Sequence, residues 1–219
     1  GFTGLLPIID LTAHFDATSP VALKANGFGV GDLTFGPFLQ LPPIMGAAGP
    51  VFSERVELDI VAPIGDYNRH ADINQSSGFW SINPYWAFTV LPAPGFEISS
   101  RLHYLYNFTN DHPAGSGPAF TIPRNFQAGA AIWDNFAASY TVAPGLDLGI
   151  NGYYFQQINQ DKINGVTQSN SETTNVSIGP GLTYAVNKTN FLFANAYLPV
   201  VEKNTTDGFH TVFRWVHIF

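Results

Sequence analysis

The fold is decided by the last eleven residues, Phe209-His-Thr-Val-Phe-Arg-Trp-Val-His-Ile-Phe219. Successive side chains of a β-strand point to opposite faces. One face then carries Phe209, Phe213, Trp215 and Phe219, and the other carries His210 and Arg214 with Val212, Val216 and Ile218. An outer-membrane β-barrel ends in this way, because its last strand closes the cylinder and its terminal aromatic residue is the kind of signal that the barrel-assembly machinery reads. The stretch therefore predicts that the other segments are membrane strands too.

The composition fits a membrane barrel better than a soluble domain. Hydrophobic residues make up 45% of the 219 residues and aromatic residues 15%, whereas only 11% are charged, which is less than half the usual share. Barrel strands alternate apolar and polar side chains, so their mean hydropathy stays near neutral. A soluble β-sandwich with as many aromatic residues would usually carry more Lys and Glu. No stretch approaches the ~18 consecutive apolar residues of a spanning helix.

Charge and residue content argue against several functional classes. The net charge is −7, with 9 basic and 16 acidic residues, which does not suit a nucleic-acid partner. Cysteine is absent, so disulfides and thiolate metal sites are excluded. The six His residues form no paired motif with Ser or Asp, and the chain has no metal-ligand spacing or phosphate-cradling loop. We expect neither an enzyme nor a protein with a cofactor.

Ten segments have the alternation of β-strands, and each is long enough to cross a membrane at a tilt. They cover residues 4–15, 29–41, 52–64, 78–91, 95–109, 125–142, 146–159, 175–186, 190–202 and 208–219. Short turns at 92–95, 143–145 and 186–188 alternate with long polar loops at 16–28, 65–77, 110–124 and 160–174. Short turns on one rim and long loops on the other are typical of outer-membrane barrels.

These patterns predict an all-β protein, a transmembrane antiparallel up-and-down β-barrel in the bacterial outer membrane. About 10 strands lie in this chain, and residues 1–219 form a single domain. The N-terminal residues lack the basic region and cleavage site of a signal peptide. We therefore expect the sequence to be a mature or truncated form.

Several strings resemble one known family in the same order along the chain. They are Gly29-Val-Gly-Asp-Leu-Thr-Phe-Gly-Pro37, Leu58-Asp-Ile-Val-Ala-Pro-Ile-Gly-Asp-Tyr67, Phe79-Trp-Ser-Ile-Asn-Pro-Tyr85, Tyr153-Tyr-Phe-Gln-Gln157 and Ile178-Gly-Pro-Gly-Leu-Thr-Tyr184. The family consists of proteobacterial outer-membrane channels associated with the meta-pathway of phenol degradation. The resemblance implies a monomeric barrel of 12 strands with an N-terminal segment folded into the lumen, through which small hydrophobic compounds pass. On this comparison, the lumen segment and the first hairpin are missing from the sequence.

Charged side chains are expected on the lumen side, because they are costly against lipid. The candidates for a polar constriction are Arg55, Glu57, Asp59, Glu97, Arg101, His103, His210 and Arg214. The alternative is a salt-bridge network that fills and rigidifies a narrow barrel, since barrels of this size are largely filled by their own side chains.

Apolar side chains are expected to point inward as well, which is unusual for a sugar or ion porin. The candidates are Phe38, Phe79, Tyr85, Leu105, Trp133 and Phe155. They indicate a passage for apolar solutes, or alternatively a surface that packs against the N-terminal segment.

The function predicted from the sequence is passive uptake of small hydrophobic or aromatic compounds. The expected partners are these solutes, outer-membrane lipids and lipopolysaccharide, and the barrel-assembly machinery through Phe219. One rival is a general diffusion channel for small polar solutes or ions. A second rival is a structural or adhesive barrel that acts through its extracellular loops.

Overall fold

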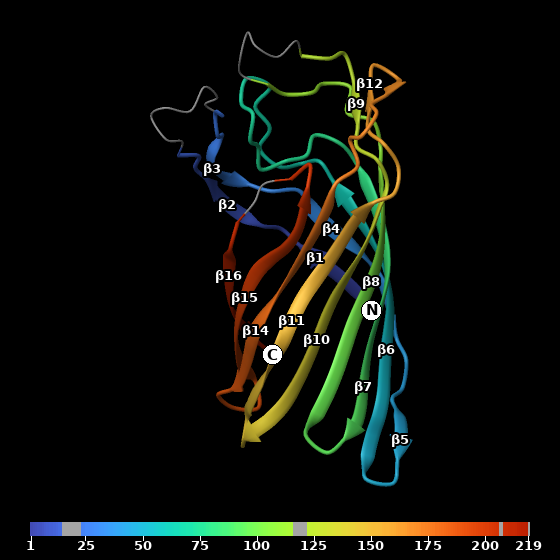
Figure 1. Ribbon diagram of the computed structural model, residues 1–219, viewed down its shortest axis with the longest axis vertical. Coiled ribbons are helices and arrows are strands. Elements are labelled where there is room, and N and C mark those ends of the chain that lie inside the picture. The colour runs from blue at the N-terminus through green and yellow to red at the C-terminus, as the bar shows by residue number, and fades with distance from the viewer. Residues whose placement is uncertain (15–22, 116–121, 206–207, 219) are drawn as a thin grey trace.

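One antiparallel sheet contains most of the chain (Figure 1). The computed structural model describes residues 1–14, 23–115, 122–205 and 208–218. Neighbouring strands along the sheet are β1 (Phe2–Leu5), β4 (Leu33–Gln40), β6 (Gly49–Ala62), β7 (Ser81–Ala93), β8 (Phe96–Asn107), β10 (Ala131–Ala143), β11 (Leu146–Gln157), β14 (Thr174–Ala185), β15 (Asn190–Lys203) and β16 (His210–His217). Every adjacent pair on this path is antiparallel. The predicted all-β, up-and-down strand order is confirmed.

The first two predicted segments are each divided between two sheets. Residues 4–15 contribute β1 to the main sheet, whereas β2 (Ile8–Leu11) pairs with β3 (Gly27–Val30). The break falls at Pro7, which has no backbone N–H to give to a strand ladder. Its carbonyl oxygen instead accepts a hydrogen bond from the backbone N–H of Gly31 at 2.8 Å.

Tight turns join the long strands at the lower end of Figure 1. Gly95, between β7 and β8, and Gly145, between β10 and β11, have φ angles of 75° and 76°. Each follows a proline, the arrangement of a type II turn, in which a positive φ favours glycine. Strand β5 (Ile44–Gly46) pairs with β6 at the same end.

The long loops gather at the opposite end and contain structure of their own (Figure 1). Strands β12 (Lys162–Ile163) and β13 (Val166–Thr167) form a hairpin that also pairs with β9 (Phe126–Gln127). The loop before β7 is held by Asp32, whose carboxylate accepts hydrogen bonds from the backbone N–H and the hydroxyl of Ser77, both at 2.8 Å. The loop before β7 is therefore attached to the start of β4, which follows Asp32.

Burial is inverted relative to a soluble domain. Among the described residues, the buried apolar side chains are four alanines, whereas the buried polar ones include Glu57, His103 and Asn151. Large apolar side chains are exposed instead, up to 80% for Phe213 and 68% for Trp215. A sheet of this kind is stable where lipid covers its apolar face and water or polar groups meet the other. In the described part of the chain, no helix is long and apolar enough to span a bilayer.

Strands β1 and β16 form the two ends of the main sheet order. The terminal residue Phe219 lies outside the described residues, so its proposed role in barrel assembly stays a prediction.

Candidate functional site

Strand register assigns each side chain of the main sheet to one of two faces. Glu57, Tyr85 and His103 occupy paired positions on β6, β7 and β8, so they share a face with every second residue of their strands. We call this the inner face. The opposite, outer face carries exposed apolar side chains, among them Val56, Leu58, Trp86, Leu102, Tyr104, Ile132, Leu148, Ile150, Tyr154, Leu192, Phe213 and Trp215.

Four rings form a row across the inner face, which we call the aromatic row. They are Tyr85 of β7, His103 of β8, Trp133 of β10 and Phe155 of β11, each paired with the next. Successive ring centroids lie 4.7, 4.1 and 6.2 Å apart, so each ring contacts its neighbour in the row. All four positions are in the half of their strands nearer the long loops.

The His103 ring is held in place by stacking and by contacts of both ring nitrogens. It is 8% exposed and stacks on Trp133 with an interplanar angle of 11°. Its Nδ1 lies 3.0 Å from Asn83 Oδ1, and its Nε2 lies 3.5 Å from Asn135 Nδ2. An amide oxygen only accepts, so Nδ1 donates to Asn83 and Nε2 accepts from Asn135. Side chains on both sides therefore hold the imidazole plane parallel to the indole.

An ion pair with a buried carboxylate and a half-buried guanidinium continues the row onto β6. Glu57 is 3% exposed, pairs with Arg55 and accepts a hydrogen bond from the Tyr85 hydroxyl. The Arg55 guanidinium lies 3.5 Å from the centre of the Phe38 ring and donates to Thr3 Oγ1 at 2.8 Å. The pair is thus enclosed between two aromatic rings, which favours a defined side-chain arrangement at this level of the sheet.

Arg101 and Asp59 lie near this pair. The Arg101 guanidinium is 5.3 Å from the centre of the Tyr85 ring, and its side chain is exposed on the inner face. Asp59 lies two positions beyond Glu57 on β6, and its Oδ1 atom is buried without a hydrogen-bond partner. Of the predicted constriction residues, Arg55, Glu57 and Arg101 lie close together, whereas Glu97 lies farther along β8 toward the tight turn and lines the cavity described next. A constriction made by these side chains remains a proposal.

A cavity of about 710 Å³, which we call the inner cavity, opens on the inner face. It extends from Arg55 and Arg101 toward the tight-turn end and is lined largely by polar side chains, including Ser53, Thr89, Glu97, Ser99, Asn135, Ser139, Asp147, Asn151, Thr183, Asn195 and Arg214. The inner face therefore has two zones, an aromatic one near the loops and a polar one below it.

The other predicted site residues lie apart from the ion pair. His210 stacks on Tyr197 at 4.7 Å, and Arg214 lies 4.4 Å from the centre of the Phe193 ring, both on β16. Leu105 pairs with Ala131 one level above the aromatic row. Phe79 lies in the loop ahead of β7.

Sequence reasoning did not select the inner-face residues Asn151, Tyr153, Asn195 and Tyr197 as site residues. Their strands pair with β14, which carries the glycines Gly179 and Gly181 on the same face. Glycine in a strand interior often marks close approach by another group. That signal could have identified them.

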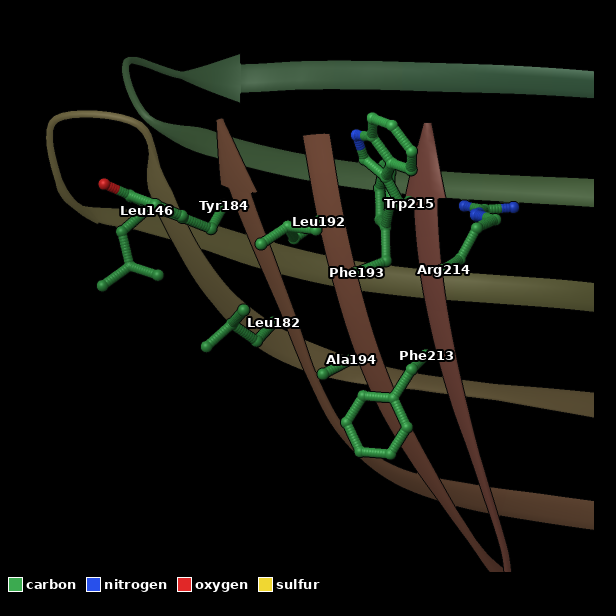
Figure 2. Close-up of a pocket in the computed structure, with 9 residues that line it drawn as sticks. All are labelled: Leu146, Leu182, Tyr184, Leu192, Phe193, Ala194, Phe213, Arg214 and Trp215. Carbon is green, nitrogen blue, oxygen red and sulfur yellow. The ribbon is translucent and has the colours of Figure 1, made fainter. Parts of the chain in front are cut away.

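The outer face also has a groove, with a volume of about 590 Å³. Figure 2 shows Leu182, Leu192 and Phe213 around Ala194, with Tyr184 and Leu146 beyond them. The short side chain of Ala194 leaves the space that the larger neighbours border. This surface is almost wholly apolar, as expected for a face that contacts lipid.

Three features define a transmembrane β-sheet protein of the bacterial outer membrane. The outer face is apolar and exposed, the inner face carries buried polar side chains, and short turns alternate with long loops. The fold is similar to that of an outer membrane channel from Pseudomonas putida F1 in its crystal structure, with a TM-score of 0.77 and 18% sequence identity. The alignment covers 100% of this chain and 82% of that chain.

Residues 1–215 match the model of the family described as "Putative MetA-pathway of phenol degradation". The chain belongs to this family, and the resemblance noted in the sequence is confirmed. No curated protein matches it in sequence. Among the described residues, no cluster of three or more His, Asp or Glu side chains could hold a metal ion.

Proposed function

We propose that the protein is a channel for passive uptake of small hydrophobic or aromatic compounds across the outer membrane. The aromatic row carries this proposal. It places aromatic side chains on the inner face at a level where a sugar or ion porin would present polar groups. The rings lie at one level of neighbouring strands, with centroid distances of 4.1 to 6.2 Å, so they form a nearly continuous aromatic band on the wall that a passing aromatic solute can contact.

In the proposed route, a solute arrives between the long loops and meets the aromatic row first. The pair of Arg55 and Glu57, together with Arg101, lies at the lower border of the row and limits the width of the passage. The solute then reaches the inner cavity and leaves toward the periplasm. The concentration difference across the membrane drives this movement, and weak contacts along the route allow the solute to leave each one quickly.

The polar lining of the inner cavity favours a second candidate, a general diffusion channel for small polar solutes. Its Ser, Thr and Asn side chains can replace water around a sugar. The two candidates differ in which zone selects the solute: the aromatic row in the first and the polar cavity in the second.

Liposome swelling separates these candidates. Vesicles that contain the purified protein are diluted into isosmotic arabinose or sucrose, and the fall in light scattering is followed. We expect swelling no faster than in empty vesicles, because the aromatic row offers sugars few hydrogen-bond partners. Fast arabinose permeation would support the second candidate and contradict the first.

Other aspects of the account are proposals of the same kind. We propose that the protein acts as a monomer, contacts lipopolysaccharide with its outer face and is recognised by the barrel-assembly machinery through its C-terminal strand. A lumen segment and two further strands in the complete protein also remain predictions from the family resemblance.

A further inference from the structure

Two amide side chains converge on the inner face above a glycine. Asn195 of β15 pairs with Gly181 of β14, whereas Asn151 of β11 pairs with Gly179 and extends its side chain over Gly181. A Cβ atom added to Gly181 would collide with Asn151 Oδ1 and lie 2.9 Å from Asn195 Oδ1. The glycine therefore leaves room for both amides to reach the same point, and all three residues line the inner cavity.

The Asn151 amide is buried without a hydrogen-bond partner. Its side chain is 8% exposed, and neither Nδ2 nor Oδ1 has a partner among the described residues. A buried amide without a hydrogen-bond partner lowers the stability of the fold by roughly 1–3 kcal/mol, because its donor and acceptor have lost their water. A group in the cavity that both donates and accepts a hydrogen bond would remove that penalty.

Aromatic rings border the same space on the side of the long loops. Tyr153 and Tyr197 lie two positions above Asn151 and Asn195 on their strands, with ring centroids 5.6 Å apart. His210 stacks on Tyr197 at 4.7 Å and lies 5.9 Å from the Tyr153 ring. The Tyr153 hydroxyl accepts a hydrogen bond from Ser177 Oγ at 3.1 Å, which fixes its ring.

From this arrangement we infer that Asn151, Asn195 and Gly181 form a binding site, the amide niche, for the neutral hydroxyl group of a small ring compound. The hydroxyl group donates to one amide oxygen and accepts from an amide nitrogen, while the ring lies against Tyr153 and Tyr197. The inference rests on the proposed channel function and specifies a binding step within it.

A neutral hydroxyl fits the niche better than a charged group. An amide offers a donor and an acceptor together, whereas a carboxylate or an ammonium group would leave one of them unpaired. An apolar substituent would leave both unpaired, so the niche should discriminate against it. The preference is thus for hydroxylated over methylated rings of the same shape.

The test compares 4-fluorophenol with 4-fluorotoluene. The two rings have the same shape, but the first carries a hydroxyl group where the second carries a methyl group. Each is titrated against the purified protein in detergent micelles, with protein-free micelles as the blank, and binding is followed by fluorine NMR. Asn151→Leu keeps the branched shape and the number of side-chain heavy atoms but removes donor and acceptor. We expect it to weaken 4-fluorophenol binding about 5- to 10-fold and to leave 4-fluorotoluene binding unchanged.

Two further variants make the test specific. Gly181→Ala places a methyl group in the niche and should weaken 4-fluorophenol binding to the same extent. Thr89→Val removes a hydroxyl from β7, on another part of the same cavity, and should have no effect. Heat-modifiable migration on gels shows whether each variant is folded.

The inference is overturned if folded Asn151→Leu and Gly181→Ala both bind 4-fluorophenol as tightly as the parent protein, or if Thr89→Val weakens it equally. These binding data require no transport. A protein that binds 4-fluorophenol in the niche but does not accelerate solute uptake would refute the channel proposal and leave the niche intact.

Discussion

Removal of Arg55 should destabilise the protein by far more than removal of any exposed charge on the inner face. Glu57 is 3% exposed, so Arg55→Met leaves a buried carboxylate without its counter-ion. Breaking a buried pair in this way costs about 3–5 kcal/mol. Because the Arg55 side chain is 30% exposed, water screens part of the charge, and we expect the lower end, about 3 kcal/mol, or roughly a 150-fold change in the folding equilibrium.

The double variant Arg55→Met, Glu57→Met tests whether the loss comes from the unpaired charge. It removes both charges while methionine stems still fill the space beside Phe38, so most of the stability should return, to within about 1 kcal/mol of the parent. Arg101→Met is the matched control, because Arg101 is exposed and lies 5.3 Å from the Tyr85 ring centre. Loss of the Arg101 guanidinium should lower the free energy of unfolding by less than about 1 kcal/mol.

The assay is equilibrium unfolding in guanidinium chloride in detergent micelles, followed by the fluorescence of the four tryptophans. The reasoning is refuted if Arg55→Met is no less stable than Arg101→Met, or if the double variant is less stable than Arg55→Met alone.

Further predictions concern the rings, the outer face and the turns. Trp133→Ala should slow toluene uptake about 2- to 10-fold by interrupting the aromatic row, and uptake by cells lacking their general porins measures this. Ser100→Ala removes the 2.6 Å hydrogen bond to Asp134 on the outer face, and the unfolding free energy should fall by about 2 kcal/mol; an unchanged value would mean that lipid or water replaces the hydroxyl. Gly95→Ala should lower the free energy of unfolding by about 1–2 kcal/mol, because Gly95 has a φ of 75°. Gly4→Ala should leave it unchanged, because a methyl group on this β1 residue meets open space. Equal effects of the two glycine substitutions would contradict a backbone origin.

Much of the fold was predictable because a strand has a side-chain period of two. Alternation in the segments around Glu57, His103 and Trp133 determines which side chains share a face, whatever their neighbours are. The loops were harder. Residues 160–174 were predicted only as a long polar loop, and they contain the hairpin of β12 and β13. Asn164-Gly165, both with positive φ, is a strong hairpin signal that the sequence did contain.

Contacts between strands were not predictable from alternation. The stacking of His103 on Trp133 depends on the register of β8 against β10, and the long loop between these strands leaves that register open in the sequence. Likewise, the convergence of Asn151 and Asn195 depends on two registers with β14. Charged residues were easier to select, since their cost against lipid assigns most of them to the inner face. Asp134 departs from this rule: it lies on the outer face, where its carboxylate accepts hydrogen bonds from the Ser100 hydroxyl and the Arg101 backbone N–H. The amide side chains of Asn151 and Asn195 are uncharged and therefore carried no such signal.

Uptake across an intact outer membrane tests the central claim most directly. Lipopolysaccharide slows the direct permeation of hydrophobic molecules, so the measurement uses Gram-negative cells lacking their general porins, with and without the protein. The initial uptake rates of radiolabelled toluene and arabinose are compared. The account predicts that the protein accelerates toluene uptake several-fold and leaves arabinose uptake unchanged; equal acceleration of both solutes, or of neither, would contradict it.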